Sequence, residues 1–187
     1  MSWRKTGIKS LGLALPLILL SALVWAADES DTGNSIVGGT IPELCQIGIS
    51  GDVSGLLTLT QDGTGETAYD AGYVESAADA VTVRVDANKQ WKLSVHYTGG
   101  GWSCPGSYDK DEADLDLRIT NTPTGTIQNG ADSYFSPTSS ATEILSHTVG
   151  VQDNDVEVQV RVDLDWTADI PGAYSITTVY TMETTTG

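Results

Sequence analysis

Alternating apolar and polar side chains mark one long segment of the chain, residues 155–166. This period of two fits a β-strand with one face in a core and the other in water, whereas a helix would scatter the apolar residues around its axis. The pattern predicts that one face of this strand is buried. The inward residues are Val156, Val158, Val160, Val162, Leu164 and Trp166, and the outward residues are Glu157, Gln159, Arg161, Asp163 and Asp165.

Shorter patterns of the same kind follow one another after residue 40, separated by Gly, Asp, Asn and Pro. No segment has the apolar spacing that is typical of an amphipathic helix. We therefore predict an all-β protein, an antiparallel β-sandwich of two sheets, with a small closed barrel as the alternative. The predicted strands span residues 45–49, 56–60, 80–86, 90–98, 113–120, 143–149, 155–166 and 173–182.

Two turn sequences predict how some of these strands connect. Residues 86–89 separate two predicted strands at hairpin spacing, and Asn88 tolerates the positive φ that such turns need. Pro171 and Gly172 suit the central positions of a type II turn, with Asp169 nearby, and predict that the last two strands pair antiparallel. The aromatic residues within predicted strands are expected in the core: Trp91, Trp166, Tyr174 and Tyr180.

The first 26 residues have the pattern of a secretory signal peptide. Three basic residues precede an apolar stretch over residues 11–24, and the chain turns acidic after Ala26. A membrane anchor is the alternative, but the stretch is shorter than the ~20 residues of a spanning helix. We predict a secreted protein that meets the membrane only transiently, through this peptide. Its predicted parts are a signal peptide (1–26), a flexible N-terminal arm (27–40) and a single domain (41–187).

Charge narrows the range of partners. The chain has 9 basic and 25 acidic residues, a formal charge of −16. Removal of residues 1–26 takes away three basic residues and no acidic one, which leaves a charge of −19 on 161 residues. Such a surface repels nucleic acids and anionic membranes, so we expect neither as a partner.

The two cysteines, Cys45 and Cys104, are predicted to form one disulfide, because an even number of cysteines in an exported chain suggests pairing. The bond would close a loop of about 60 residues and stabilise the fold by roughly 4 kcal/mol. A nucleophilic thiol is the alternative, and oxidation outside the cell argues against it.

One acidic run is a candidate Ca²⁺ site. Asp109, Asp111 and Asp114 lie close together in residues 109–116, and hard oxygen ligands at close spacing are what Ca²⁺ requires. The run lacks the glycine and the glutamate of an EF-hand loop, and a solvated strand face explains the same residues.

Three aromatic residues are candidates for a ligand surface. Trp102 follows three consecutive glycines, and Tyr134 and Phe135 lie in a polar segment, residues 121–142, that is predicted to be a long surface loop. For Trp102 the alternative is packing against the disulfide.

Catalytic motifs are absent from the sequence. The only histidines, His96 and His147, lie in predicted strands, and neither has an adjacent acid or nucleophile motif. The chain has no nucleophile elbow, zinc-protease helix, phosphate loop or dinucleotide fingerprint. We therefore expect a protein that is not an enzyme and that needs no cofactor, Ca²⁺ being the one ion considered.

Two segments carry a resemblance to a broad group of exported bacterial proteins. Trp91-Lys92-Leu93 in a central predicted strand and the closing segment 171–182 are similar to features of WxL-domain cell-surface proteins and of spore-coat-U-like and pilin-like proteins. In WxL proteins a second tripeptide lies near the C-terminus; here Tyr180-Thr181-Met182 takes that place and differs at both defining positions. The resemblance implies an immunoglobulin-like or pilin-like sandwich, with attachment to peptidoglycan through Trp91 and Leu93, or exchange of a strand such as 27–40 between subunits.

We therefore expect a secreted, non-enzymatic cell-surface protein of structure or adhesion. It would associate with itself, with other surface proteins or with cell-wall polysaccharide, as a filament subunit or a wall-associated protein. The alternative is an extracellular β-sandwich module that binds a carbohydrate or Ca²⁺.

Overall fold

The computed structural model describes residues 41–60 and 64–185. The chain divides into two units, Met1–Ile41 and Pro42–Gly187, and the fold below is that of the second. The predicted signal peptide and the predicted N-terminal arm lie outside the described residues.

Sheet A has five strands, and its central strand is the segment with the longest alternation. Strand β8 pairs antiparallel with β3 and β2, which follow one another along one of its edges, and with β5 along the other edge. Strand β1 pairs with the far side of β3. The strands are β1 (Cys45–Gly51), β2 (Tyr73–Glu75), β3 (Val81–Ala87), β5 (Leu115–Ile119) and β8 (Val151–Asp163).

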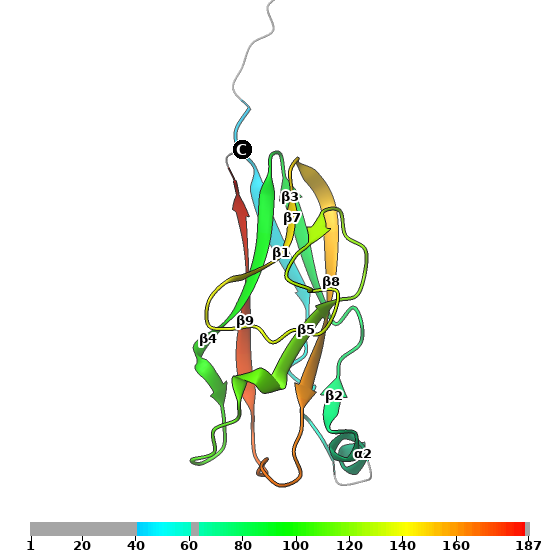
Figure 1. Cartoon of the computed structure of the whole chain (residues 1–187), viewed down its shortest axis with the longest axis vertical. Coiled ribbons are helices and arrows are strands. Elements are labelled where there is room, and N and C mark those ends of the chain that lie inside the picture. Colours follow the sequence, from blue (N-terminus) through cyan, green and yellow to red (C-terminus); the bar gives the residue numbers. More distant parts are fainter. Residues whose placement is uncertain (1–40, 61–63, 186–187) are drawn as a thin grey trace, which may run out of the picture. The chain divides into compact units, whose positions relative to one another are not determined.

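Sheet B has four antiparallel strands in the order β6-β7-β4-β9. They are β4 (Trp91–Ser103), β6 (Thr126–Ile127), β7 (Thr142–His147) and β9 (Ser175–Thr184). Figure 1 shows β4 and β9 lying side by side and running along the length of this unit. An all-β protein with two antiparallel sheets was predicted, and the structure confirms it.

The core between the sheets is built from alternating residues of both. Val156, Val158, Val160 and Val162 of β8 are at most 6% exposed, as predicted. Sheet B contributes Trp91, Leu93 and Val95 of β4, each fully buried. The apolar face of a strand is buried wherever the opposite sheet covers it, and this burial is the main term that stabilises the fold.

The alternation of β8 ends earlier than predicted. The strand stops at Asp163, so Leu164 is only half-buried and Trp166 is 58% exposed. Beyond the last paired residue no ladder holds the backbone extended, and a turn over residues 165–169 redirects the side chains. The prediction that Trp166 lies in the core is therefore wrong.

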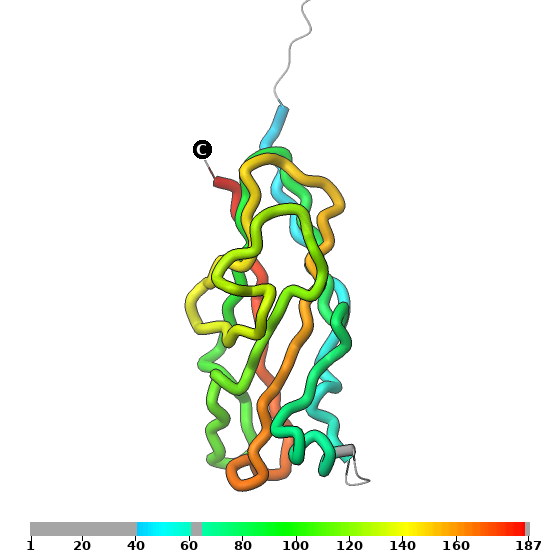
Figure 2. The backbone as a smooth tube through the Cα atoms, turned by 45° about the vertical axis from the view of Figure 1, so that its right-hand side comes forward, coloured from blue at the N-terminus to red at the C-terminus, as the bar shows by residue number. Residues whose placement is uncertain are grey.

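The two predicted hairpins are also wrong. Strand β3 belongs to sheet A and β4 to sheet B, so residues 88–90 cross between the sheets. The same holds for β8 and β9, which flank Pro171 and Gly172. In Figure 2 the connection between β8 and β9, in orange, turns at one end of the unit. The strands β3, β4, β8 and β9 each pair with strands that do not directly precede or follow them in the sequence.

One helix was missed, and one predicted strand is absent. Helix α2 (Thr64–Ala71) has no apolar stripe, and it ends at Gly72, whose φ of 78° suits a helix C-terminus. The preceding segment, 56–60, contains turns and no strand.

Among the described residues, no helix is long and apolar enough to cross a membrane.

The predicted disulfide does not form. Cys45 and Cys104 are both free thiols, and Cys45 Sγ lies 3.8 Å from the carbonyl oxygen of Met182. Cys104 follows Ser103, which pairs with Ser175. Along β9 these positions are seven residues apart, or about 23 Å at ~3.3 Å per residue. A disulfide requires Cβ atoms about 4 Å apart, so the two cysteines lie too far apart to pair.

Candidate functional site

A pocket of about 520 Å³ lies at the end of the unit where helix α2 and the β8–β9 connection meet. Its wall comes from four segments of the chain: residues 57–60, 65–69, Lys110 and 164–174. Leu57, Leu59 and Leu164 supply an aliphatic part of this wall. A concave, largely apolar site with a few fixed polar groups is the usual form of a small-ligand site.

Two aromatic rings form one wall of the pocket. Trp166 and Tyr69 lie with ring centroids 4.8 Å apart and planes inclined by 37°. The indole Nε1 of Trp166 donates a hydrogen bond to Asp70 Oδ1 at 3.1 Å, which fixes the ring although most of it is exposed. The result is an oriented aromatic surface that water still reaches.

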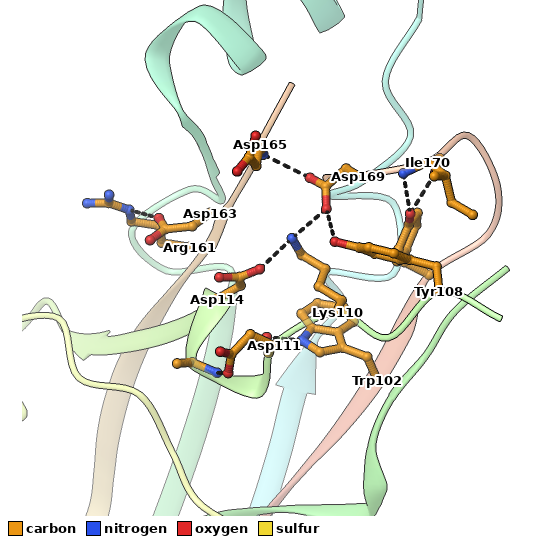
Figure 3. Close-up of polar contacts among 12 residues, drawn as sticks. Trp102, Tyr108, Lys110, Asp111, Asp114, Arg161, Asp163, Asp165, Asp169 and Ile170 are labelled. Atoms are coloured by element: carbon orange, nitrogen blue, oxygen red, sulfur yellow. Dashed lines mark hydrogen bonds and ion pairs between the residues drawn. The ribbon is translucent and has the colours of Figure 1, made fainter. Parts of the chain in front are cut away.

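A buried ion pair lies at the inner side of the pocket. Lys110 Nζ is 3.0 Å from Asp169 Oδ1, and both side chains are only 2% exposed. The same nitrogen is 2.7 Å from Asp114 Oδ2, on the side away from Asp169 (Figure 3). Two carboxylates thus compensate the charge of this buried cation, as burial of a charge requires.

Two tyrosines complete the polar network. Tyr108 donates to Asp169 Oδ1 at 2.9 Å, and its ring meets the edge of Tyr174 with centroids 6.0 Å apart. The hydroxyl of Tyr174 donates to the Ile170 carbonyl at 2.6 Å and accepts from the Ile170 N–H at 3.1 Å. Both tyrosines therefore hold the β8–β9 connection that forms part of the wall (Figure 3).

The charge states of this network follow from its contacts. Burial would lower the pKa of Lys110, but hydrogen bonds to Asp114 and Asp169 outweigh it and raise the pKa above the usual lysine value. Burial would raise the pKa of Asp169, but bonds from the Asp165 N–H, Lys110 and Tyr108 outweigh it and lower the pKa. At neutral pH the pair is therefore ionised, with its charges satisfied within the protein.

Local sequence explains how the β8–β9 connection keeps its shape. Asp165 accepts hydrogen bonds from the backbone and side chain of Thr167, both at 2.7 Å, and its own N–H donates to Asp169 Oδ2 at 3.0 Å. This is the Asx-type turn that aspartate favours. Gly172 packs so closely on Pro105 that a Cβ would lie 2.3 Å from the proline Cβ, so the connection needs glycine there.

The acidic run serves two structural roles. Asp111 accepts a hydrogen bond from Ala113 N at 2.9 Å and caps the short 3₁₀ helix η1 (Glu112–Asp114). Asp114 is held by Lys110, and Asp109 is exposed. Within the part of the chain that the structure describes, no three His, Cys, Asp or Glu side chains are grouped so that they could hold a metal ion.

The three aromatic residues predicted as a ligand surface lie elsewhere. Trp102 is 9% exposed and its Nε1 donates to the Asp111 carbonyl at 3.1 Å. Phe135 packs on the core and exchanges backbone hydrogen bonds with Leu117. Tyr134 lies under the guanidinium of Arg118, 4.5 Å from the ring centroid. None of the three lines the large pocket.

The tripeptide Trp91-Lys92-Leu93 lies in the middle of sheet B. Trp91 and Leu93 point into the core and are fully buried, whereas Lys92 forms an exposed ion pair with Glu183 at 2.9 Å. In this structure the side chains of Trp91 and Leu93 pack in the core between the two sheets and are inaccessible to a partner.

Sequence reasoning missed the residues that make the pocket. Trp166 was predicted in the core, and Tyr69 and Lys110 were not singled out. One signal was available, because Lys110 is the only basic residue in an otherwise acidic run and a lysine there requires carboxylate partners.

Compared with known proteins, the chain matches no protein-family model and no curated protein sequence.

Proposed function

We propose that this protein is an exported, non-enzymatic adhesion protein whose pocket binds a neutral saccharide, such as a segment of cell-wall polysaccharide. One observation carries the proposal: the fixed but exposed ring of Trp166 stands at the mouth of a pocket of about 520 Å³. The pocket favours the carbohydrate-binding alternative over attachment through Trp91 and Leu93, since those two side chains are buried.

The chemistry of the wall suits a sugar ring. A pyranose has an apolar face of C–H groups and a rim of hydroxyls, so it needs an aromatic plane beside hydrogen-bonding groups. Trp166 and Tyr69 supply the aromatic plane, and Glu66 lines the same pocket. Tyr and Trp are suited to this because they join a large apolar ring to a polar group.

Charge argues against an anionic ligand. Among the described residues of the wall Lys110 is the only cation, and it is neutralised by Asp114 and Asp169, while Glu66 adds a further negative charge. A phosphate or a uronic acid would therefore meet no free positive group and would lose its hydration without compensation. A neutral polyol meets no such cost.

The site is better suited to binding than to turnover. Asp169 accepts hydrogen bonds from Lys110, Tyr108 and the Asp165 N–H, so it has little capacity left for a substrate. Its lowered pKa keeps it ionised and makes it a poor general acid. The same proposal includes export through residues 1–26, a surface location and a relationship to pilin-like or WxL proteins. These three parts rest on the sequence alone.

Calorimetric titration of the exported protein tests the binding proposal. The probes are soluble oligomers of N-acetylglucosamine, xylose and glucose, with polygalacturonate as the anionic comparison. We expect one neutral series to bind, and Trp166→Ala to weaken its binding at least tenfold. Val149→Ala is the matched control, because Val149 is 57% exposed, like Trp166 at 58%, and lies outside the pocket.

Three results would contradict the binding of a neutral saccharide. The first is binding that Trp166→Ala leaves unchanged. The second is binding of polygalacturonate alone, and the third is failure of every neutral oligomer and of isolated cell-wall polysaccharide to bind. Release of reducing ends from a bound oligomer would show turnover and contradict the non-enzymatic assignment.

A further inference from the structure

Strand β1 is poorly covered, although its first residue, Cys45, lies against Met182 of β9. All seven of its residues are exposed, which is true of no other described strand. Ile47 and Ile49 lie opposite Val85 and Val83 in the register with β3, so they share the core-facing side of sheet A. They are nevertheless 39% and 54% exposed, so this side of β1 is incompletely covered.

The outer edge of β1 is also open. Within the described residues β1 pairs only with β3, through seven consecutive pairs without a bulge. The opposite edge of sheet A is covered, since Leu117 of β5 exchanges backbone hydrogen bonds with Phe135 and Ile119 N donates to Ala131 at 2.6 Å. Native proteins protect bare edges with lysine, proline or bulges, and β1 has none of these.

We propose that two copies of this chain pair antiparallel, edge to edge, through β1. A two-fold axis through Gly48 places Ile47 opposite the partner's Ile49. The two core-facing apolar rows then form one continuous patch, and the open backbone groups of each edge find partners. This surface is separate from the pocket, whose wall contains no residue of β1.

Charge identifies a second copy as the occupant. The chain carries a formal charge of −16, so most faces of two copies repel each other. Residues 44–51 contain no carboxylate and no basic side chain, and Glu43 before them is already paired with Lys89 at 2.9 Å. A strand that is uncharged, free of bulges and seven residues long is complementary to its own copy in antiparallel pairing.

Sedimentation equilibrium of the exported protein, in reducing buffer so that Cys45 and Cys104 cannot link copies, tests this contact. We expect a monomer–dimer equilibrium at concentrations up to about 1 mM, the range of weak complexes. Ile49→Lys should raise the dissociation constant at least tenfold. Val149→Lys is the matched control: it adds the same charge at a site that is 57% exposed, against 54% for Ile49, and should dimerise like wild type.

Hydrogen exchange of the wild type provides a second measurement that needs no variant. The outward amides of β1 should exchange slowly in the dimer and fast after dilution to the monomer. A wild type that stays monomeric throughout this range would overturn the proposal, as would equal dimerisation of Ile49→Lys and Val149→Lys. Open-ended filaments would also overturn it, because a two-fold contact closes at two copies.

Discussion

Trp91 and Trp166 show how differently two regions of one molecule use the same side chain. Both lie in segments that alternate between apolar and polar residues, and both were predicted in the core. Trp91 lies between the sheets and is fully buried, whereas Trp166 is 58% exposed at the mouth of the pocket. The difference is in the backbone: Trp91 is paired with His147 and Thr184, and Trp166 lies three residues beyond the end of β8.

This difference marks where alternation stops being informative. Within a paired strand the ladder forces successive side chains to opposite faces, and the sheet opposite decides which face is buried. Past the last pair, local hydrogen bonds take over, and at residues 165–169 the side chain of Asp165 sets the turn. A region that packs in the core and a region that lines a pocket can therefore follow one another in a single sequence pattern.

Removal of the buried ring should have the largest effect on stability. Trp91→Ala should lower the free energy of unfolding by about 3–5 kcal/mol, because it leaves a large cavity between the sheets. The comparison variant is Trp91→Phe. The Nε1 of Trp91 is buried without a hydrogen-bond partner among the described residues, so phenylalanine removes an unsatisfied donor and should cost clearly less.

Urea unfolding with a constant m-value measures both Trp91 variants. Equal midpoints for Trp91→Ala and wild type would show that this part of the core is not closed as described.

Loss of the ion pair of the pocket should have an effect of similar size. Lys110→Met leaves Asp169 buried beside Tyr108 without its cation, and breaking a buried pair in this way costs about 3–5 kcal/mol. Lys92→Met is the matched control: Lys92 pairs with Glu183 at 2.9 Å, but the two side chains are 36% and 59% exposed, and such surface pairs contribute about 0–1 kcal/mol.

The two lysine variants are compared by the same urea titration. An equal loss of unfolding free energy in Lys110→Met and Lys92→Met would mean that water reaches Lys110. The pocket would then be more open than the 2% exposure of the Lys110 side chain indicates.

Much of the fold was predictable because strands are local patterns. Seven of the eight predicted strands overlap observed ones, and the burial of Val158 and Val160 follows from alternation alone. The assignment of strands to sheets was not predictable in the same way. A short link such as residues 88–90 can turn within one sheet or cross to the other, and the choice depends on which distant strand completes the ladder.

The site was less predictable, for two physical reasons. Helix α2 is short and has no apolar face, so the sequence has no helical spacing of apolar residues that would predict it. The pairing of Lys110 with Asp169 joins residues 59 positions apart, and no local pattern carries that information. Outside the site, the two cysteines were paired by counting, although counting says nothing about the roughly 23 Å that β9 places between them.

Removal of the exposed ring should have the smallest effect on stability and completes the comparison. Trp166→Ala deletes a stack with Tyr69 and one hydrogen bond to Asp70. A partly exposed stack of this kind contributes about 0.5–1.5 kcal/mol, and little apolar area is newly exposed because most of the ring already meets water. We expect the free energy of unfolding to fall by about 1 kcal/mol, well below the loss for Trp91→Ala, when both variants are unfolded in urea side by side. A loss as large as that of Trp91→Ala would mean that the ring is buried, and Trp166 would then belong to the core as the alternation of residues 155–166 predicts.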